Sequence, residues 1–134
     1  MRHKRVVITH YGGQEAITAI EEDIPAPKAG EVRMKVLAAG VSLPDVLARE
    51  GVHPETPRVP YTPGWDLAGT VDQPGEGVTG FEPGQTAAAM PIHGCYAQYV
   101  CVPQRKLVPV PAGLDAAEAV AVVLNYIGCS PLTL

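Results

Sequence analysis

The sequence has few cysteines, no excess of basic residues and no long apolar run, and each shortage excludes a class of protein. Its three cysteines, Cys95, Cys101 and Cys129, are far apart and form no C-x-x-C pair, so we expect neither a disulfide framework nor a zinc knuckle. The longest apolar run, residues 119–124, is far too short to span a bilayer. The charged N-terminus has no apolar segment behind it and is not a signal peptide. We therefore expect a soluble protein of a reducing compartment, by default the cytoplasm.

Basic charge is scarce as well, because 10 Lys and Arg residues are set against 14 Asp and Glu residues, for a net charge of −4. Such a chain is not attracted to nucleic-acid phosphates or to anionic membranes, so we expect neither as a partner. Glycine and proline, by contrast, are abundant, with 14 of each spread along 134 residues. This distribution predicts one domain of short strands joined by turns.

The clearest strand covers residues 31–36, where Val32, Met34 and Val36 alternate with charged side chains. This period of two is typical of a strand with one buried face. Further strands are predicted at residues 5–10, 17–24, 67–72, 85–90, 96–102 and 106–110. The pattern is therefore mainly β.

A short helix is predicted to begin after Ser42 and to end near Gly51. Ser42 and Asp45 have the spacing of a capping box, in which the Asp45 side chain reaches back to the Ser42 amide. Residues 53–64 follow and contain four prolines, which predicts an extended, irregular loop.

A second helix is predicted to begin after Asp115, which is a good N-cap with Glu118 three residues further on. Residues 119–124 are apolar on all sides, which predicts a buried helix. The strands do not supply enough surface to bury it. We therefore expect an apolar surface around Val122 that pairs two copies into a homodimer.

The pattern G-x-G-x-x-G occurs at residues 75–80, but it does not have the setting of a dinucleotide-binding loop. In such a loop the last glycine opens a helix, whose N-terminus receives the pyrophosphate. Here Pro83 and Gly84 follow at once and favour a turn. The interpretation is therefore a glycine turn without phosphate binding.

No metal site and no nucleophilic triad is predicted. The four histidines, one of which is His53, have no pair with ligand spacing. Ser42 lacks the G-x-S-x-G setting of a nucleophile, and its hydroxyl is already explained by capping. Trp65 and Asp66 stand side by side in the loop, and two roles stay open for them: a core plug with a turn acceptor, or part of a functional site.

Five segments carry a resemblance to a known family. In chain order they are A-A-G-V-S-L-P-D at 38–45, R-E-G at 49–51, T-P-G-W-D-L-A-G at 62–69, G-E-G-V-T-G-F-E-P-G at 75–84 and G-C-Y-A-Q-Y at 94–99. Together they resemble the catalytic, GroES-like domain of medium-chain dehydrogenases/reductases, especially the quinone oxidoreductase group. The resemblance covers nearly the whole chain and implies a GroES-like, partly open β-barrel of about six to eight strands with a few short helices.

The resemblance places the chain in the zinc-free branch of that family. Zinc alcohol dehydrogenases have a cysteine where Ser42 stands and a histidine where Trp65 stands, so both metal ligands are absent here. The zinc-free branch reduces quinones or activated alkenes with NADPH or NADH, which implies a small-molecule quinone or enone substrate. The branch usually has an asparagine at the position of Ser42 and tyrosines at those of Leu47 and His53, so all three positions differ.

By this resemblance we expect Ser42, Asp45 and His53 to line the catalytic cleft, with His53 either a proton donor or an ordinary loop residue. Asn125 and Tyr126 are expected on the cofactor side. The family continues into a Rossmann half that holds the dinucleotide. We expect that half to be missing after residues 1–127 and a divergent tail at 128–134, so that the isolated chain binds no cofactor and is inactive. The alternative is a GroES-like binding or assembly module without enzymatic activity, with residues 54–63 as its contact loop.

Overall fold

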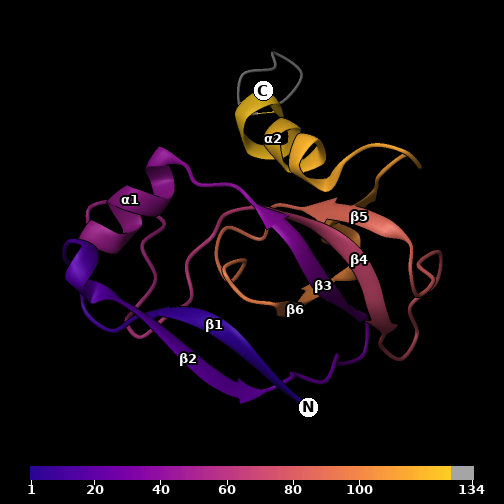
Figure 1. Cartoon of the computed structure of the whole chain (residues 1–134), viewed down its shortest axis with the longest axis horizontal. Helices are drawn as coiled ribbons and strands as arrows, with labels where there is room; N and C mark the ends of the chain where they lie inside the picture. The colour runs from indigo at the N-terminus through magenta and orange to yellow at the C-terminus, as the bar shows by residue number, and fades with distance from the viewer. Residues whose placement is uncertain (128–134) are drawn as a thin grey trace.

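The computed structural model describes residues 1–127, with side chains as far as Val122, and the predicted divergent tail at 128–134 lies outside the described residues. These residues form two sheets and two α-helices (Figure 1). The strands are β1 (Arg2–Ile8), β2 (Ile17–Asp23), β3 (Glu31–Ala39), β4 (Leu67–Pro74), β5 (Thr86–Ala89), β6 (Tyr99–Pro103) and β7 (Leu107–Pro109), and the helices are α1 (Leu43–Glu50) and α2 (Ala116–Ile127). The prediction of a mainly-β, partly open fold with a few short helices is confirmed, and the sheets do not close into a complete barrel.

The smaller sheet is the antiparallel hairpin of β1 and β2, in register from Arg2–Asp23 to Ile8–Ile17. The larger sheet has the order β6-β3-β4-β5-β7, and every pair in it is antiparallel. Two isolated bridges, Arg5–Ala97 and Ile8–Tyr61, join the hairpin to the rest of the chain. Figure 1 shows the hairpin below and beside the larger sheet, with α1 next to its turn.

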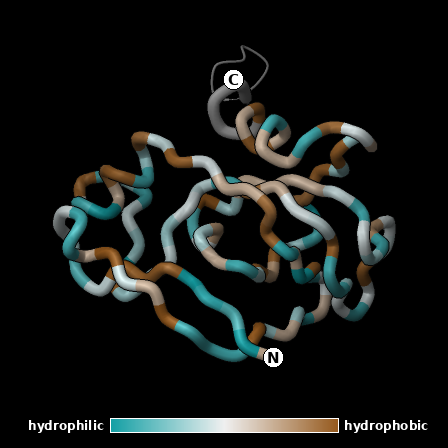
Figure 2. The backbone as a smooth tube through the Cα atoms, in the orientation of Figure 1, coloured by the Kyte–Doolittle hydropathy of each residue, from teal (hydrophilic) through white to brown (hydrophobic). Residues whose placement is uncertain are grey.

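The predicted alternation of β3 determines which face enters the core. Val32 and Met34 are fully buried, whereas Lys35, on the same strand, is exposed. Figure 2 shows the same change between hydrophobic and hydrophilic residues along the strands. The main core cluster consists of Val32, Met34, Leu67, Val71, Ala87, Ala89, Cys95, Val102 and Leu107. Burial of these apolar side chains is the main force that holds the larger sheet together.

The close approach of β3 and β4 requires a glycine. A Cβ atom on Gly69 would lie 2.1 Å from the carbonyl oxygen of Lys35, so no other residue fits there without moving the strand. The pairing also shifts register between Val36 and Ala38. This irregularity leads the end of β3 into Gly40 and the start of α1, where the predicted cleft residues begin.

Helix α2 lies across one end of the larger sheet, over β3, β4 and β5 (Figure 1). Ala119 and Val120 are buried against Ala68 and Ala88. The next residues are exposed, with Val122 at 47 %. The sheet therefore buries one face of this apolar helix, and the other face leaves the apolar surface around Val122 that the sequence led us to expect.

The glycine motif at 75–80 forms the connection between β4 and β5 and opens no helix, as predicted. Gly75 packs against backbone, since a Cβ there would lie 2.2 Å from the carbonyl oxygen of Lys28, and Gly77 has a positive φ of 78°. The glycines serve turn geometry. Across residues 1–127, the structure contains no helix that is both long and apolar enough to cross a membrane.

Candidate functional site

The predicted capping box forms at the start of α1. The Asp45 carboxylate accepts hydrogen bonds from the Ser42 backbone N–H at 3.1 Å and from the Ser42 hydroxyl at 2.9 Å. The helix ends at Gly51, which has the left-handed conformation with φ 82°. Two of the three predicted cleft residues are therefore in direct contact.

Asp45 also binds two segments that are distant in the sequence. Its Oδ1 accepts the backbone N–H of Gly64 at 3.2 Å, and its Oδ2 lies 3.3 Å from the hydroxyl of Tyr96. Asp45 is only 6 % exposed, so these donors take the place of water. A buried carboxylate with this many donors fixes the relative positions of α1, the proline loop and the segment before β6.

Gly40 is held from both sides at the end of β3. Its N–H donates to Asp66 Oδ1 at 2.9 Å, and its carbonyl accepts from the Tyr96 hydroxyl at 2.9 Å. A Cβ atom on Gly40 would lie 2.6 Å from the same Asp66 oxygen, so the contact depends on glycine. Asp66 is 2 % exposed and accepts this hydrogen bond from a segment distant in the sequence, so the predicted role of a turn acceptor is not what this bond shows.

Tyr96 is the residue of this network that sequence reasoning did not select. It belongs to the segment 94–99 that carries the family resemblance, but that resemblance did not assign a role to Tyr96. Burial, and then the negative charge of Asp45, raise the pKa of the Tyr96 hydroxyl well above its usual range. The hydroxyl therefore keeps its proton and acts as a donor.

His53 contacts the site through Trp65. The two rings meet edge to face with their centres 5.1 Å apart, and Trp65 stands between the residues that bind Asp45 and Gly40. The Nδ1 atom of His53 accepts the backbone N–H of Glu55 at 3.0 Å, so a neutral ring carries its proton on Nε2. His53 is thus built into the loop and still has one N–H to donate, and the structure leaves both predicted roles open.

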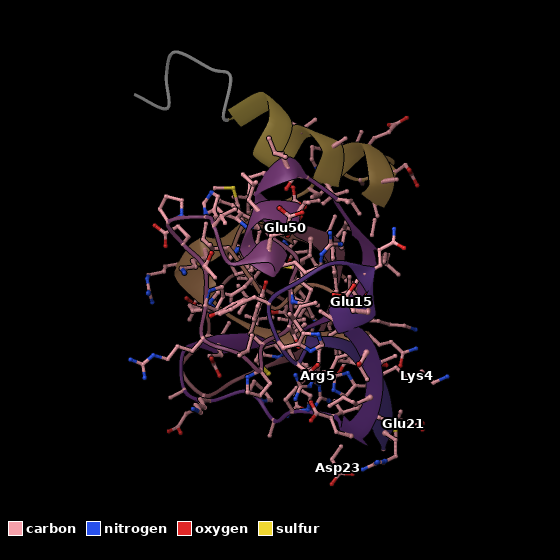
Figure 3. The ribbon with its side chains drawn as sticks, turned by 90° about the vertical axis from the view of Figure 1, so that its left-hand side faces the viewer. Lys4, Arg5, Glu15, Glu21, Asp23 and Glu50 are labelled. Carbon is pink, nitrogen blue, oxygen red and sulfur yellow. The ribbon has the colours of Figure 1, made fainter. Side chains whose placement is uncertain are left out.

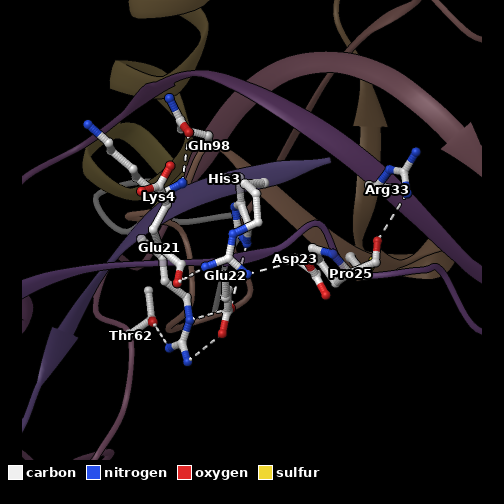
Figure 4. Close-up of polar contacts among 12 residues, drawn as sticks. His3, Lys4, Glu21, Glu22, Asp23, Pro25, Arg33, Thr62 and Gln98 are labelled. Atoms are coloured by element: carbon white, nitrogen blue, oxygen red, sulfur yellow. Dashed lines mark hydrogen bonds and ion pairs between the residues drawn. The ribbon is translucent and has the colours of Figure 1, made fainter.

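A network of charged residues anchors the proline loop to the hairpin. The guanidinium of Arg5 donates to Glu22 on β2 and, at 2.7 Å, to the hydroxyl of Thr62 (Figure 4). This hydrogen bond with Arg5 holds the pKa of Glu22 below its ordinary value. On the outer side of the hairpin, Lys4 and Glu21 point away from the sheets (Figure 3). The loop that carries Trp65 is therefore tied to the hairpin at Thr62.

Two pockets lie at opposite ends of the folded domain, within its described residues. One, of about 250 Å³, lies between the hairpin and α1 and includes Asp45 and Tyr96 in its wall. The other, of about 430 Å³, lies under α2. It is lined by Ala88, Ala89, Met90, Lys106, Val108, Pro109, Val110, Pro111, Leu114, Ala119 and Val122. Only the first combines apolar walls with the polar network around Ser42.

The chemistry that these side chains could perform is limited to binding, orientation and proton transfer. Burial raises the pKa of Cys95 far above its usual range and that of Cys101 to about 11, so neither thiol is a nucleophile at neutral pH. Within residues 1–127, no group of three or more His, Cys, Asp or Glu side chains could hold a metal ion. Asn125 and Tyr126 belong to the last turn of α2, and their side chains lie outside the described residues.

Comparisons with known proteins agree on one family. Residues 28–112 match the family model described as the alcohol dehydrogenase GroES-like domain. The quinone oxidoreductase of Lama guanicoe is 31% identical over 126 residues, which are 92% of this chain and 38% of that protein. The crystal structure of the human synaptic vesicle membrane protein VAT-1 homolog-like protein is 28% identical, with a TM-score of 0.91 over 96% of this chain and 41% of the other.

A third relative is a mycobacterial protein whose structure was solved in complex with NADPH. It is 26% identical, with a TM-score of 0.76 over 85% of this chain and 35% of the other. The chain thus spans between a third and two fifths of the length of these three relatives.

Proposed function

Because this chain belongs to the alcohol dehydrogenase GroES-like domain family, we propose that it forms the substrate side of an NAD(P)H-dependent quinone or enone oxidoreductase. The observation that carries the proposal is the network around Asp45, which holds Ser42 and the Trp65 loop together at the edge of a pocket. The match to a quinone oxidoreductase over 92% of the chain supports the substrate class. The relative in complex with NADPH supports the cofactor class.

Residues 1–127 do not have the loop that binds the phosphates of a dinucleotide. These phosphates require a glycine-rich loop that opens a helix, and within residues 1–127 the glycine motif at 75–80 leads into a strand instead. We therefore propose that the dinucleotide is held by a second domain, in the part of the relatives that this chain does not match. When bound, the cofactor supplies a hydride for an electron-poor carbon.

The residues of this chain are proposed to bind and orient the substrate ring. Trp65 and His53 offer an aromatic edge against which a flat ring could pack. Ser42 is proposed as the polar contact, because Asp45 binds both Ser42 and Gly64, the residue before Trp65. His53 has an N–H on Nε2 that can donate to a substrate oxygen. We also propose that the site is zinc-free, because Ser42 and Trp65 occupy the two ligand positions of the zinc enzymes and neither is a zinc ligand of the usual kind.

The alternative of an assembly module receives no support from the proline loop. A contact loop of that type has to be free to move, whereas residues 54–63 are tied to the hairpin. Tyr61 and Ile8 exchange two backbone hydrogen bonds, and the Tyr11 hydroxyl donates to the carbonyl of Pro57 at 2.6 Å. The reductase proposal is therefore the better supported of the two.

The experiment is a reductase assay on a fusion protein, in which residues 1–127 are continued by the remaining part of the mycobacterial relative whose structure was solved with NADPH. We expect quinone-dependent loss of NADPH absorbance, and an at least tenfold lower rate when Trp65 and His53 are both replaced by alanine. The 134-residue chain alone is the control and is expected to consume no NADPH. A folded fusion that binds NADPH but reduces no quinone or enone would contradict the proposal, and so would turnover by the chain alone.

A further inference from the structure

The hydroxyl of Ser42 has a single proton, and its partner determines where that proton points. Ser42 Oγ lies 2.9 Å from Oδ2 of Asp45. A carboxylate has only acceptor atoms, so Ser42 must be the donor in this hydrogen bond. A ligand that approaches Ser42 then meets an oxygen that can accept a hydrogen bond but has no proton left to give.

Asp45 is unable to turn away and release this proton. Asp45 is 6 % exposed, and its carboxyl group is held by the N–H groups of Ser42 and Gly64 as well. The same reasoning applies to Tyr96, whose hydroxyl lies within hydrogen-bond distance of the Gly40 carbonyl and of Asp45, both of which only accept. The hydroxyl protons at this end of the molecule are therefore turned inward.

Ser42 is partly exposed, so a ligand can reach this residue. We infer that Ser42 determines specificity as a hydrogen-bond acceptor, and that the cleft prefers a ring that carries a hydroxyl group over the same ring with carbonyl groups only. This inference rests on the proposed function, which places the substrate ring beside Ser42. For a quinone reductase it means that Ser42 does not polarise the quinone carbonyl, and that the hydroquinone product is held more tightly than the quinone.

The test uses two compounds with the same carbon skeleton, duroquinone and durohydroquinone, titrated into the 134-residue chain without oxygen. Their rings are fully substituted, so neither compound adds to the cysteine thiols. Amide peaks of Ser42 and Gly64, and the indole N–H peak of Trp65, report binding by NMR. Trp65 is the single tryptophan of the chain, which makes its indole peak unambiguous.

We expect the hydroquinone to bind about tenfold more tightly than the quinone, the effect of one hydrogen bond. Ser42→Ala should remove this preference by weakening hydroquinone binding alone, and Ser42→Thr, which keeps the hydroxyl, should retain it. Equal binding of the two compounds, a preference for the quinone, or a preference that survives in Ser42→Ala would overturn the assignment of Ser42 and leave the proposed function standing. Binding of neither compound would contradict the proposed function itself and the inference with it.

Discussion

The two ends of this domain bury their side chains in different ways. At the α1 end, Asp45, Asp66 and Tyr96 are drawn into the protein and hydrogen-bonded to the backbone of distant segments. At the α2 end, the pocket is lined by apolar side chains, with Lys106 as its one charged residue, and Val122 remains 47 % exposed. Buried polar networks fix geometry, whereas exposed apolar surface gains free energy when something covers it.

This difference indicates that the two ends of the domain have different roles. The α1 end has the rigidity that a site for orienting a substrate needs, since Ser42, Asp45 and Tyr96 are hydrogen-bonded to fixed partners. The α2 end has the composition of a contact surface. The predictions below test this contrast, first at the polar network and then at the apolar face.

The largest effect is expected for Asp45→Ala. It leaves the N–H groups of Ser42 and Gly64 without their acceptor in a buried place, which should lower the free energy of unfolding by about 3 kcal/mol. Chemical unfolding measures this loss. Asp115→Ala is the matched control at the α2 end, because Asp115 is an exposed N-cap that accepts the Ala117 N–H, and its loss should cost only about 1 kcal/mol. Equal costs at the two positions would remove the contrast.

Tyr96→Phe is expected to lower the free energy of unfolding by about 1 kcal/mol, because the Gly40 carbonyl loses its donor. Tyr61→Phe is the control, since the buried Tyr61 hydroxyl has no hydrogen-bond partner within the described residues, and its removal should be neutral or slightly stabilising. Thermal unfolding of the two variants side by side gives the comparison. A Tyr61→Phe variant as unstable as Tyr96→Phe would show that the Tyr96 hydrogen bonds contribute nothing.

The hairpin network should make a small, pH-dependent contribution. The hydrogen bond from Arg5 lowers the pKa of Glu22 below its ordinary 4.5, so this stability is fully present above pH 4.5 and is lost as the pH falls through the lowered value. Glu22→Gln should therefore cost less than about 1 kcal/mol at neutral pH, because the carboxylate is partly exposed, and nothing once Glu22 is protonated. The measurement is the free energy of unfolding against pH for Glu22→Gln and for Glu21→Gln. Glu21 is a neighbour without an ion pair in the described residues, so its variant shows the effect of losing a carboxylate alone. If the stability lost in Glu22→Gln became larger as the pH falls, the predicted direction of the pH dependence would be contradicted.

The smallest effect on folding is expected at the α2 end. Val122→Glu should change the free energy of unfolding by no more than about 0.5 kcal/mol, because Val122 is half in solvent. We propose that this face is where two copies associate, so the variant should shift the protein toward a monomer in size-exclusion chromatography with light scattering. An oligomeric state that is the same in Val122→Glu and in the unaltered chain would show that this face is not the contact.

The sequence predicted the local features of the site, because local features depend on neighbouring residues. The period of two at residues 31–36, the capping box of Ser42 and Asp45, and the N-cap at Asp115 all appear in the structure. The decoy glycine motif at 75–80 was also recognised, since a nearby proline and glycine are visible in the sequence.

Long-range contacts could not be predicted in the same way. Strand β6 begins at Tyr99, three residues later than predicted, because the backbone of Tyr96 and Gln98 is hydrogen-bonded to β1. The exposed apolar face of α2 around Val122 was expected, but which residues of the helix lie against the sheet depends on tertiary packing and could not be read from the sequence. The hydrogen bonds that reach Asp45 from Gly64 and Tyr96 depend on the same tertiary geometry.

The most direct test of where this domain binds its ligand is a map of amide shifts as duroquinone is added to the 134-residue chain. The account predicts saturable shifts at Ser42, His53 and Trp65, with little change at Val108 and Leu114 beneath α2. Shifts concentrated at Val108 and Leu114, with Ser42 and Trp65 unmoved, would contradict it and would place the ligand site at the apolar end.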